Sequence, residues 1–334
     1  MGTAIGDLLP RTKIGLEQID TVAIDAFNAI YQFLSIIRQK DGTPLTDNAG
    51  RITSHLSGLF YRTAHILEAG VRPAYVFDGE PPELKKDTVT KRRQTREHAT
   101  REWLQARAEG RADAFKYAQA SARLDDQVLE SSRSLIHYLG IPVVNAPSEG
   151  EAQAAYMASN GDVSFAASQD IDALLFGAPR LVRNLTITGR RKLPGKNVYV
   201  NISPELLDLE DILASLEISR EQLIEVSILV GTDYNEGVKG IGPKKALKMI
   251  KAFGIEQALE NLGTKIDFEQ IKKFFLDPSI TRTYSLTWAP VNEKEITEFL
   301  CDEHNFSRER VENTLQRIIA AQDDANQRSL AQWL

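Results

Sequence analysis

The stretch FAASQDIDALLFG, residues 165–177, decides the fold. It is apolar or small for most of its length, which is typical of a buried strand in a parallel sheet. Two carboxylates, Asp170 and Asp172, interrupt it with one residue between them. Because residues i and i+2 of an extended strand face the same side, we expect both acids to point into one cleft at the end of that strand.

Similar apolar runs alternate with helical patterns along the first part of the chain. Predicted buried strands lie at 21–26, 74–79, 141–147 and 163–170. Predicted helices lie at 52–69, 84–109, 123–139 and 149–159. After about residue 203 the pattern is mostly helical, with predicted helices at 203–216, 219–230, 243–253, 267–276 and 307–323. Strand–helix alternation predicts an α/β fold with a central, mainly parallel sheet.

Acidic residues gather at one predicted edge of this sheet, the C-terminal ends of the strands, where open parallel sheets bind ligands. Asp25 and Asp78 end two predicted strands, and Glu149 and Glu151 follow a third. Asp233 closes a further apolar run and joins the set if its helix packs behind the sheet. The full set is Asp25, Asp78, Glu149, Glu151, Asp170, Asp172 and Asp233.

Seven carboxylates in one cleft would repel one another and raise their own pKa values. A hard divalent cation removes this conflict, and a pair of Mg²⁺ or Mn²⁺ ions is suited to phosphodiester hydrolysis. Single members have structural explanations: Ser148 and Glu151 fit a helix capping box, and Asp78-Gly79 is a common turn pair. Those explanations do not account for five separate segments delivering acids to one edge, so the sequence predicts a metal centre.

The composition excludes several other classes of protein. No run of 18 apolar residues suggests a transmembrane helix, and the first residues lack the pattern of a signal peptide, so we expect no membrane partner. The single cysteine, Cys301, cannot form an internal disulfide and suits a reducing compartment. The five histidines show no paired ligand spacing, which argues against zinc. A net charge of −6 argues weakly against nucleic acid, but the charges are unevenly distributed.

Basic residues concentrate at 83–124, which holds 11 Lys or Arg against 6 Asp or Glu. On a helix, Lys85, Arg92 and Arg96 would share one face. A solvated helix face explains such a stripe on its own. Beside a metal cleft, the stripe better fits a phosphate clamp.

A second basic feature is VKGIGPKKALKMIKAFG, residues 238–254. Its glycine turn leads into a helix whose first turn contains Pro243, and backbone N–H groups at such a start bind phosphate without reading sequence. Lysines would line one face of the helix, and Ala246, Ile250 and Phe253 would form the buried face. The alternative is an ordinary amphipathic helix with a tight lead-in turn. The candidate DNA-binding residues are Gly240, Gly242, Lys244, Lys245 and Lys248.

The last residues, QRSLAQWL, contain a spaced set of one glutamine and three apolar side chains. One helical turn would bring the apolar ones together as an anchor for a partner's pocket. The set is Gln327, Leu330, Trp333 and Leu334.

Seven segments together resemble the structure-specific 5′ nucleases, and among them the archaeal flap endonucleases. The segments are VAIDAFNAIYQFL, TSHLSGLFYRT, YVFDGEPPELK, APSEGEAQAAY, SQDIDALLFG, LVGTDYNEGVKGIGPKKAL and the tail. They occur in the family's order and run nearly from end to end of the chain. The resemblance implies a PIN-like nuclease core with a central, mainly parallel sheet, a helical arch and a helix–two-turns–helix DNA-binding element.

The resemblance also implies an activity: cleavage of 5′ flaps and 5′–3′ exonuclease action on branched DNA in replication and repair. It implies that the seven acids hold two Mg²⁺ ions, with Mn²⁺ as a substitute, and that Lys85 and Arg92 contact the scissile phosphate. Tyr31 matches the family's stacking tyrosine, and Gly2 matches its N-terminal glycine, although the residues after Gly2 diverge. The glycine turn at 240–242 matches a K⁺ site, and the tail matches a sliding-clamp-binding box.

The expected organisation is a single nuclease domain, residues 1–325, followed by a clamp-binding tail at 326–334. Within the domain, the arch is expected at about 80–124 and the helix–two-turns–helix element at about 219–258. We expect a monomer in the cytoplasm of an archaeal cell, associated with the nucleoid. Two other functions stay open: a related PIN-like enzyme acting on RNA or DNA bubbles, and a non-catalytic clamp-binding scaffold. The intact acid set argues against the scaffold.

Overall fold

The structure, a computed structural model, describes residues 3–111, 113–187, 190–192 and 199–331; for 190–192, 199–201 and 324–331 it describes the backbone alone. Its centre is a seven-stranded sheet with the order β1–β9–β6–β5–β2–β3–β4. Only β9 runs antiparallel to its neighbours, β1 and β6, and the other pairs are parallel. The prediction of an α/β fold with a mainly parallel sheet is therefore confirmed.

The sheet's strands are short. They are β1 Thr12–Lys13, β2 Thr21–Asp25, β3 Arg72–Phe77, β4 Val143–Asn145, β5 Phe165–Ala167, β6 Arg180–Arg183 and β9 Glu205–Asp208. A separate two-stranded sheet pairs β7 Arg190–Lys192 with β8 Tyr199–Asn201.

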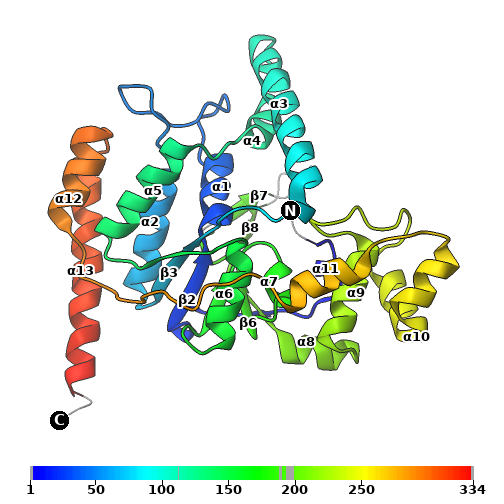
Figure 1. Ribbon diagram of the computed structural model, residues 1–334. Coiled ribbons are helices and arrows are strands. Elements are labelled where there is room, and N and C mark those ends of the chain that lie inside the picture. Colours follow the sequence, from blue (N-terminus) through cyan, green and yellow to red (C-terminus); the bar gives the residue numbers. More distant parts are fainter. Residues whose placement is uncertain (1–2, 112, 188–189, 193–198, 332–334) are drawn as a thin grey trace.

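Helices cover both faces of the sheet, each over its own hydrophobic core (Figure 1). One face carries α1 Ala26–Ile36, α2 Ser54–Glu68, α5 Asp126–Tyr138, α12 Glu293–Thr297 and α13 Arg308–Ala331. The other carries α6 Gly150–Ser159, α7 Asp172–Leu175, α8 Leu209–Leu216, α9 Arg220–Val230, α10 Pro243–Leu262 and α11 Phe268–Leu276. Among the described residues, no helix is both long and apolar enough to cross a membrane.

Parallel pairing brings the C-terminal ends of the central strands to one edge. All five residues of β2 are buried, as expected for a strand covered on both faces. Asp25 is the last residue of β2 and lies opposite Val76 of β3, so Asp78 comes two residues further along at the same edge. This is the edge at which the acids were predicted from the sequence.

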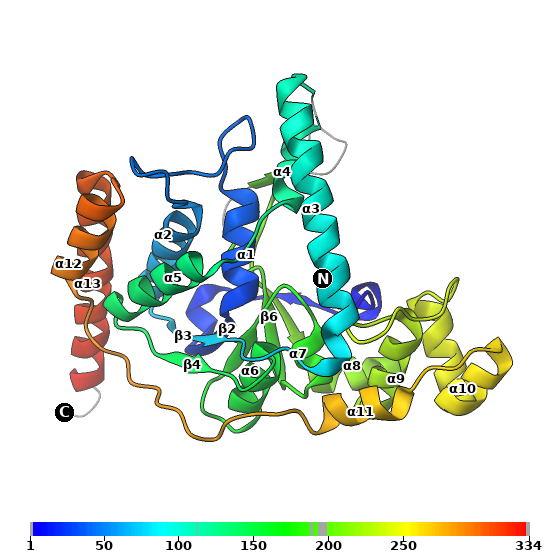
Figure 2. The same ribbon diagram turned by 45° about the horizontal axis from the view of Figure 1, so that its top comes forward.

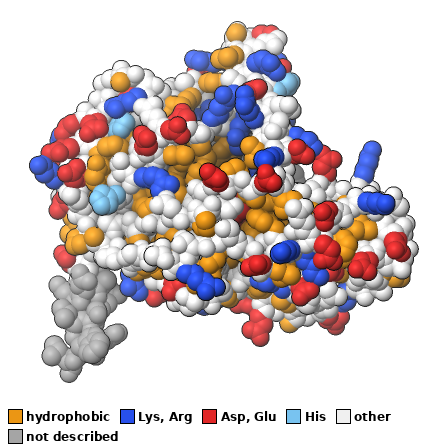
Figure 3. Space-filling view, viewed as in Figure 1, with side chains coloured by type: hydrophobic (Ala, Val, Ile, Leu, Met, Phe, Trp, Pro, Cys, Tyr) orange, Lys and Arg blue, Asp and Glu red, His pale blue; other side chains and the backbone are white. Residues whose placement is uncertain are grey.

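Two helices, α3 Lys86–Ala108 and α4 Ala114–Ala120, project from the body as an arm (Figures 1 and 2). Of the side chains of α3, only Ala99 and Ala106 are buried. Lys and Arg side chains gather on this arm (Figure 3). The arm rests on the loop after α1, where Arg107 pairs with Asp41 at 3.0 Å. It occupies the position expected for the arch and is called the arch below.

The predicted helix at 203–216 is partly wrong. Residues Glu205–Asp208 form β9, which bridges β1 and β6, and only Leu209–Leu216 is helical. Asp208 marks the change, because its carboxylate accepts hydrogen bonds from the backbone N–H groups of Glu210 and Asp211 and so caps α8.

The expected buried face of the helix at 243–253 is also wrong in one position. Ala246 and Ile250 are buried, but Phe253 is 57% exposed. The cause is Gly254, whose φ of 71° and ψ of 175° interrupt α10 and end its first segment at Phe253.

Candidate metal centre

Two of the seven acids are held by the backbone at the starts of helices. Asp25 caps α1, where its Oδ1 accepts a hydrogen bond from the N–H of Asn28 at 2.9 Å. Asp78 follows β3, and its Oδ1 accepts from the N–H of Gly150 at 2.7 Å. Asp78 is thus tied to the first residue of α6, a contact that a local Asp-Gly turn does not provide.

Glu149 and Glu151 lie at the start of α6. The capping-box explanation for Glu151 is wrong, because the N-cap residue of α6 is Glu149, not Ser148, and the Glu149 side chain makes no capping hydrogen bond. Glu151 instead accepts a hydrogen bond from the hydroxyl of Ser168 at 2.7 Å. Glu151 therefore faces the segment after β5 that carries Asp170.

The expectation that Asp170 and Asp172 share a strand face is wrong. Strand β5 ends at Ala167, Asp170 lies in the following bend, and Asp172 is the first residue of α7. Asp172 is held from a distant segment: the N–H and the hydroxyl of Thr3 both donate to its Oδ1 at 3.0 Å. The two acids nevertheless interact with each other and with the rest of the cluster.

Asp233 joins the set from the turn after α9, which packs behind the sheet. It is 9% exposed, and its Oδ1 accepts from Arg92 Nη2 at 2.5 Å. Its backbone carbonyl accepts from the hydroxyl of Thr88 on α3. The arch therefore begins directly over the acid cluster.

Burial raises the pKa values of five of these carboxyl groups, and repulsion by neighbouring acids adds to the effect at all of them except Asp78; the five are Asp25, Asp78, Glu149, Glu151 and Asp172. Burial raises the pKa of Asp25 well above its ordinary value, and the charge of Asp78 adds to it. Burial likewise raises the pKa of Glu151, with further contributions from Asp172 and Asp170. Such shifts mark carboxylates that share one poorly solvated space.

Asp172 and Glu149 also interact electrostatically with other acids of the cluster. Burial, followed by the charges of Asp170 and Asp233, raises the pKa of Asp172 to about 6, against the opposing hydrogen bonds from Thr3. Burial also raises the pKa of Glu149, which feels the charges of Asp78 and Asp233. All seven predicted acids thus belong to one electrostatic cluster.

The ammonium group of Lys85 neutralises part of the negative charge of this cluster. Lys85 Nζ lies 2.6 Å from Glu149 Oε2 and 3.5 Å from Asp233 Oδ2, and its side chain is 14% exposed. Burial alone would lower the pKa of Lys85, but the nearby carboxylates of Glu149, Asp233 and Asp78 together outweigh it and raise the pKa. A positive charge is thus stabilised among these carboxylates.

The donor set fits hard divalent cations, since every member offers carboxylate oxygens and none offers sulfur or imidazole. As the side chains stand, no three acidic, histidine or cysteine residues in the described ranges are spaced to hold an ion. Three of the carboxylates instead accept hydrogen bonds, from Lys85, Arg92 and Thr3.

The other predicted DNA contacts lie on surfaces around the cluster. On the arch, the Arg96 guanidinium lies over the ring of Tyr31, 5.4 Å from its centroid. Gly240, Gly242, Lys244, Lys245 and Lys248 are all exposed at the start of α10. Lys251 instead pairs with Glu217 at the end of α8. Nothing in the described chain fills the space beside the Gly240 and Gly242 α-carbons.

Five predicted contact residues cannot be placed with their side chains. Gly2, Trp333 and Leu334 fall outside the described residues, and Gln327 and Leu330 lie on the part of α13 described by its backbone alone. Helix α13 continues to Ala331, beyond the predicted end at 323.

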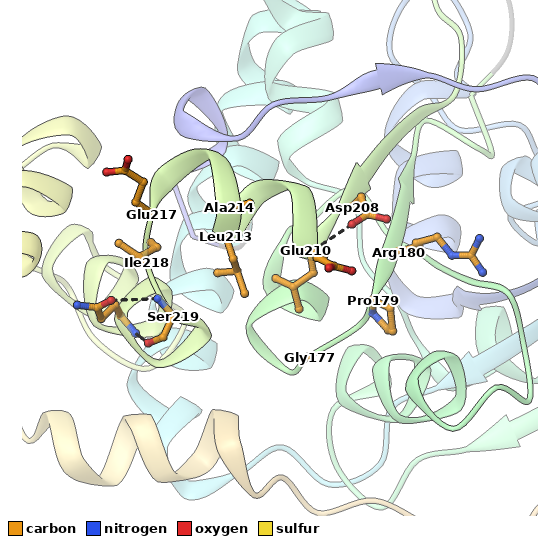
Figure 4. A pocket seen from close by; sticks show the side chains of 12 residues that line it. Gly177, Pro179, Arg180, Asp208, Glu210, Leu213, Ala214, Glu217, Ile218 and Ser219 are labelled. Atoms are coloured by element: carbon orange, nitrogen blue, oxygen red, sulfur yellow. Dashed lines mark hydrogen bonds between the residues drawn. The ribbon is translucent and has the colours of Figure 1, made fainter.

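A pocket of about 730 Å³ lies away from the acid cluster (Figure 4). It is formed by the segment before β6 together with α8 and the start of α9, where Ser219 and Gln222 cap the helix reciprocally. None of the seven acids lines it. The acid cluster at the sheet edge is therefore separate from this pocket.

The sequence reading missed three donors that bind the acids: Thr3, Asn28 and Ser168. Thr3 lies 169 positions from its partner Asp172, a separation that no local pattern reveals. Asn28 and Ser168 each lie within three positions of an acid of the set, and that proximity is the only signal for them in the sequence.

The chain is similar to known nuclease proteins over most of its length. Residues 12–99 match the XPG N-terminal domain, and residues 140–233 match the XPG I-region. Flap endonuclease 1 of Pyrococcus horikoshii is 56% identical over 337 residues, covering 100% of this chain and 98% of that protein.

Solved structures of related proteins are also similar to this chain over nearly its whole length. Flap endonuclease-1 from Methanococcus jannaschii superposes with a TM-score of 0.77 at 39% identity, covering 97% of this chain and 100% of that one. The catalytic core of Rad2 in complex with DNA substrate shares the fold, with a TM-score of 0.69 at 24% identity over 94% of this chain and 98% of that one. From its full-length similarity to the relatives that bear this name, the chain belongs to the flap endonuclease family.

Proposed function

We propose that the protein is a structure-specific 5′ flap endonuclease and 5′–3′ exonuclease that cleaves branched DNA in replication and repair. One observation carries the proposal: seven carboxylates from five segments converge at one sheet edge, directly under a basic arch. Asp25, Asp78, Glu149, Glu151, Asp170, Asp172 and Asp233 would hold two Mg²⁺ ions, or Mn²⁺ in their place. Such ions supply an activated water and stabilise charge on the phosphate.

The side chains around the acids have separate tasks. Lys85 and Arg92, which now contact Glu149 and Asp233, would turn to the scissile phosphate and stabilise its developing charge. Tyr31 would stack against a base, and Gly2 would contact the DNA. The exposed start of α10 would hold duplex phosphates, with K⁺ bound at the glycine turn. Specificity would come from DNA shape and phosphate position.

The test is a cleavage assay on labelled 5′-flap, nicked, bubble and RNA substrates, with and without Mg²⁺. We expect Mg²⁺-dependent cleavage of the flap substrate in preference to the others. A preference for bubbles or RNA would assign the protein to a related nuclease. Absence of cleavage on every substrate with Mg²⁺ or Mn²⁺ would contradict an enzymatic function.

Mg²⁺ should raise the melting temperature, and the effect should depend on pH. The folded-state pKa of Asp172, about 6, lies above its ordinary value of 3.8, so its proton stabilises the fold fully below about pH 4. That contribution is lost as the pH rises through about 6 and amounts to on the order of 1–3 kcal/mol. Bound Mg²⁺ needs deprotonated ligands, so it should stabilise more at pH 8 than at pH 5.

Calorimetric melting with EDTA or with Mg²⁺ at both pH values measures this. Without metal, the acid cluster should stabilise the protein less at pH 8 than at pH 5, so the melting temperature in EDTA should be lower at pH 8. Mg²⁺ should remove this difference. An identical melting temperature with EDTA and Mg²⁺ at pH 8 would contradict the metal centre.

The C-terminal residues should serve partner binding alone. We propose that Gln327, Leu330, Trp333 and Leu334 bind a sliding clamp, because an aromatic anchor with apolar neighbours suits a partner's pocket. Deleting residues 327–334 should leave cleavage of a free flap oligonucleotide nearly unchanged and remove clamp binding. Trp333→Ala should do most of the same damage, since a buried Trp anchor contributes roughly 2 kcal/mol or more.

Parallel cleavage assays and calorimetric titrations with the cognate clamp would show this split. Unchanged clamp affinity in the truncated chain would rule out the proposed tail function. If the truncated chain unfolds, the tail serves the fold instead.

A further inference from the structure

The hydroxyl of Ser168 lies among three acids of the cluster, each on a different segment. It donates to Glu151 Oε1 at 2.7 Å, lies 3.4 Å from Asp25 Oδ2, and accepts from the N–H of Asp170 at 3.2 Å. Ser168 is 7% exposed. One buried hydroxyl therefore connects the end of β2, the start of α6 and the bend after β5.

Asn28 on α1 makes a second connection between two of these segments, the end of β2 and the bend after β5. Its Nδ2 donates to Asp170 Oδ2 at 3.2 Å, and its Oδ1 accepts from the N–H of Gln169 at 3.2 Å. Its own N–H donates to Asp25 Oδ1. The Asn28 amide thus holds both the backbone and the carboxylate of the bend.

These contacts differ from those of ordinary buried serines in this chain. The hydroxyl of Ser132, which is fully buried in α5, donates to the carbonyl of Val128 one turn earlier in its own helix. The hydroxyl of Ser227 in α9 does the same with Leu223. Such bonds satisfy a hydroxyl locally, whereas the Ser168 hydroxyl contacts, among the residues that the structure describes, three acids of the cluster.

Carboxylates that repel one another do not hold a fixed arrangement without donors between them. The hydrogen bonds from Ser168 and Asn28 restrict the orientation of three acids that would otherwise move apart. Groups in this position around a metal site, behind the ligands, set ligand orientation, and their loss typically weakens metal affinity 10–100-fold.

We propose that Ser168 and Asn28 are positioning residues that fix Asp25, Glu151 and Asp170 in the arrangement that binds divalent ions. The inference rests on the proposed function, because it assigns these residues to the same metal centre. It assigns them no contact with the substrate.

The test is calorimetric titration of the full chain with Mn²⁺, without DNA, for the parent, Ser168→Ala, Asn28→Ala and Ser132→Ala. We expect Ser168→Ala and Asn28→Ala to bind Mn²⁺ about 10–100-fold more weakly than the parent. Ser132→Ala, the matched loss of a buried hydroxyl, should bind like the parent. In single-turnover cleavage, both variants should need more metal and recover most of the parent rate when metal is saturating.

The outcomes separate the two proposals. A parent that binds no Mn²⁺ would overturn the metal centre and, with it, this inference. If the parent binds, but Ser168→Ala and Asn28→Ala bind within twofold of it, the positioning role is wrong while the metal centre stands. If Ser168→Ala does not fold, Asn28→Ala decides, because alanine is the best helix former and suits α1. An equal loss of affinity in Ser132→Ala would also overturn the role.

Discussion

Asp172→Asn should abolish cleavage while leaving the metal-free protein as stable as the parent or more so. The substitution removes one negative charge from the cluster but keeps an Oδ1 atom that can accept both hydrogen bonds from Thr3. The single-turnover rate with saturating Mg²⁺ should fall at least about 10³-fold, or about 4 kcal/mol in the barrier. Removal of a buried charge, together with its repulsion by Asp170 and Asp233, should add on the order of 1–3 kcal/mol of stability near pH 8.

Asp20→Asn is the matched control. Asp20 precedes β2 at the opposite edge of the sheet and forms an exposed pair with Arg72. This change also removes one carboxylate charge, but it should affect neither cleavage nor Mg²⁺ binding. If Asp172→Asn keeps the parent rate, Asp172 is not a ligand and the assignment of the cluster fails. If its activity is lost together with the fold, calorimetric melting will show it.

The positions of Asp25 and Asp78 could be predicted from sequence because both follow from strand pattern and strand direction. Asp25 and Asp78 directly end or follow buried apolar runs, and parallel pairing of β2 with β3 then sets their common edge. Nothing beyond strand pattern and strand direction is needed for these two. The prediction of the cluster depends on this regularity.

The local geometry at Asp170 and Asp172 could not be predicted in the same way. The apolar pattern continues past Ala167, but β5 stops there because the chain turns into α7. The hydrogen bonds that hold this bend come from Asn28, more than 140 positions away in the sequence. Contacts over such separations leave no periodic signal.

The error at 205–208 has a related cause. The segment ELLD, with its two leucines, and the helix after it form one continuous pattern, which favours a longer helix. Pairing with β6 and with β1 overrides that local preference, and β1 lies near the start of the chain. Phe253 was misplaced for a local reason, the positive φ of Gly254, which a glycine permits but does not require.

Lys85→Ala and Arg92→Ala should lower the rate of the chemical step. Each residue holds a positive charge against the acids, where it can reach a phosphate bound at the cluster. Loss of either charge should reduce the single-turnover rate at saturating DNA and Mg²⁺ by about 10²–10³-fold, roughly 3–4 kcal/mol. Saturating Mg²⁺ is essential, because removal of the Lys85 ammonium also changes the charge felt by Glu149 and therefore metal affinity.

Adjacent basic residues provide matched controls. Lys86 and Arg93 carry the same charges one position further along, but their side chains are 71% and 80% exposed and pair with Glu83 and Glu97 on the arch. Lys86→Ala and Arg93→Ala should weaken DNA binding slightly and leave the saturated single-turnover rate unchanged. If the Lys85 and Arg92 variants behave like these controls, the arch only gathers DNA by charge. A loss confined to Lys85→Ala and Arg92→Ala would instead assign the chemical role to the two side chains that point into the cluster, since net charge is matched in each pair.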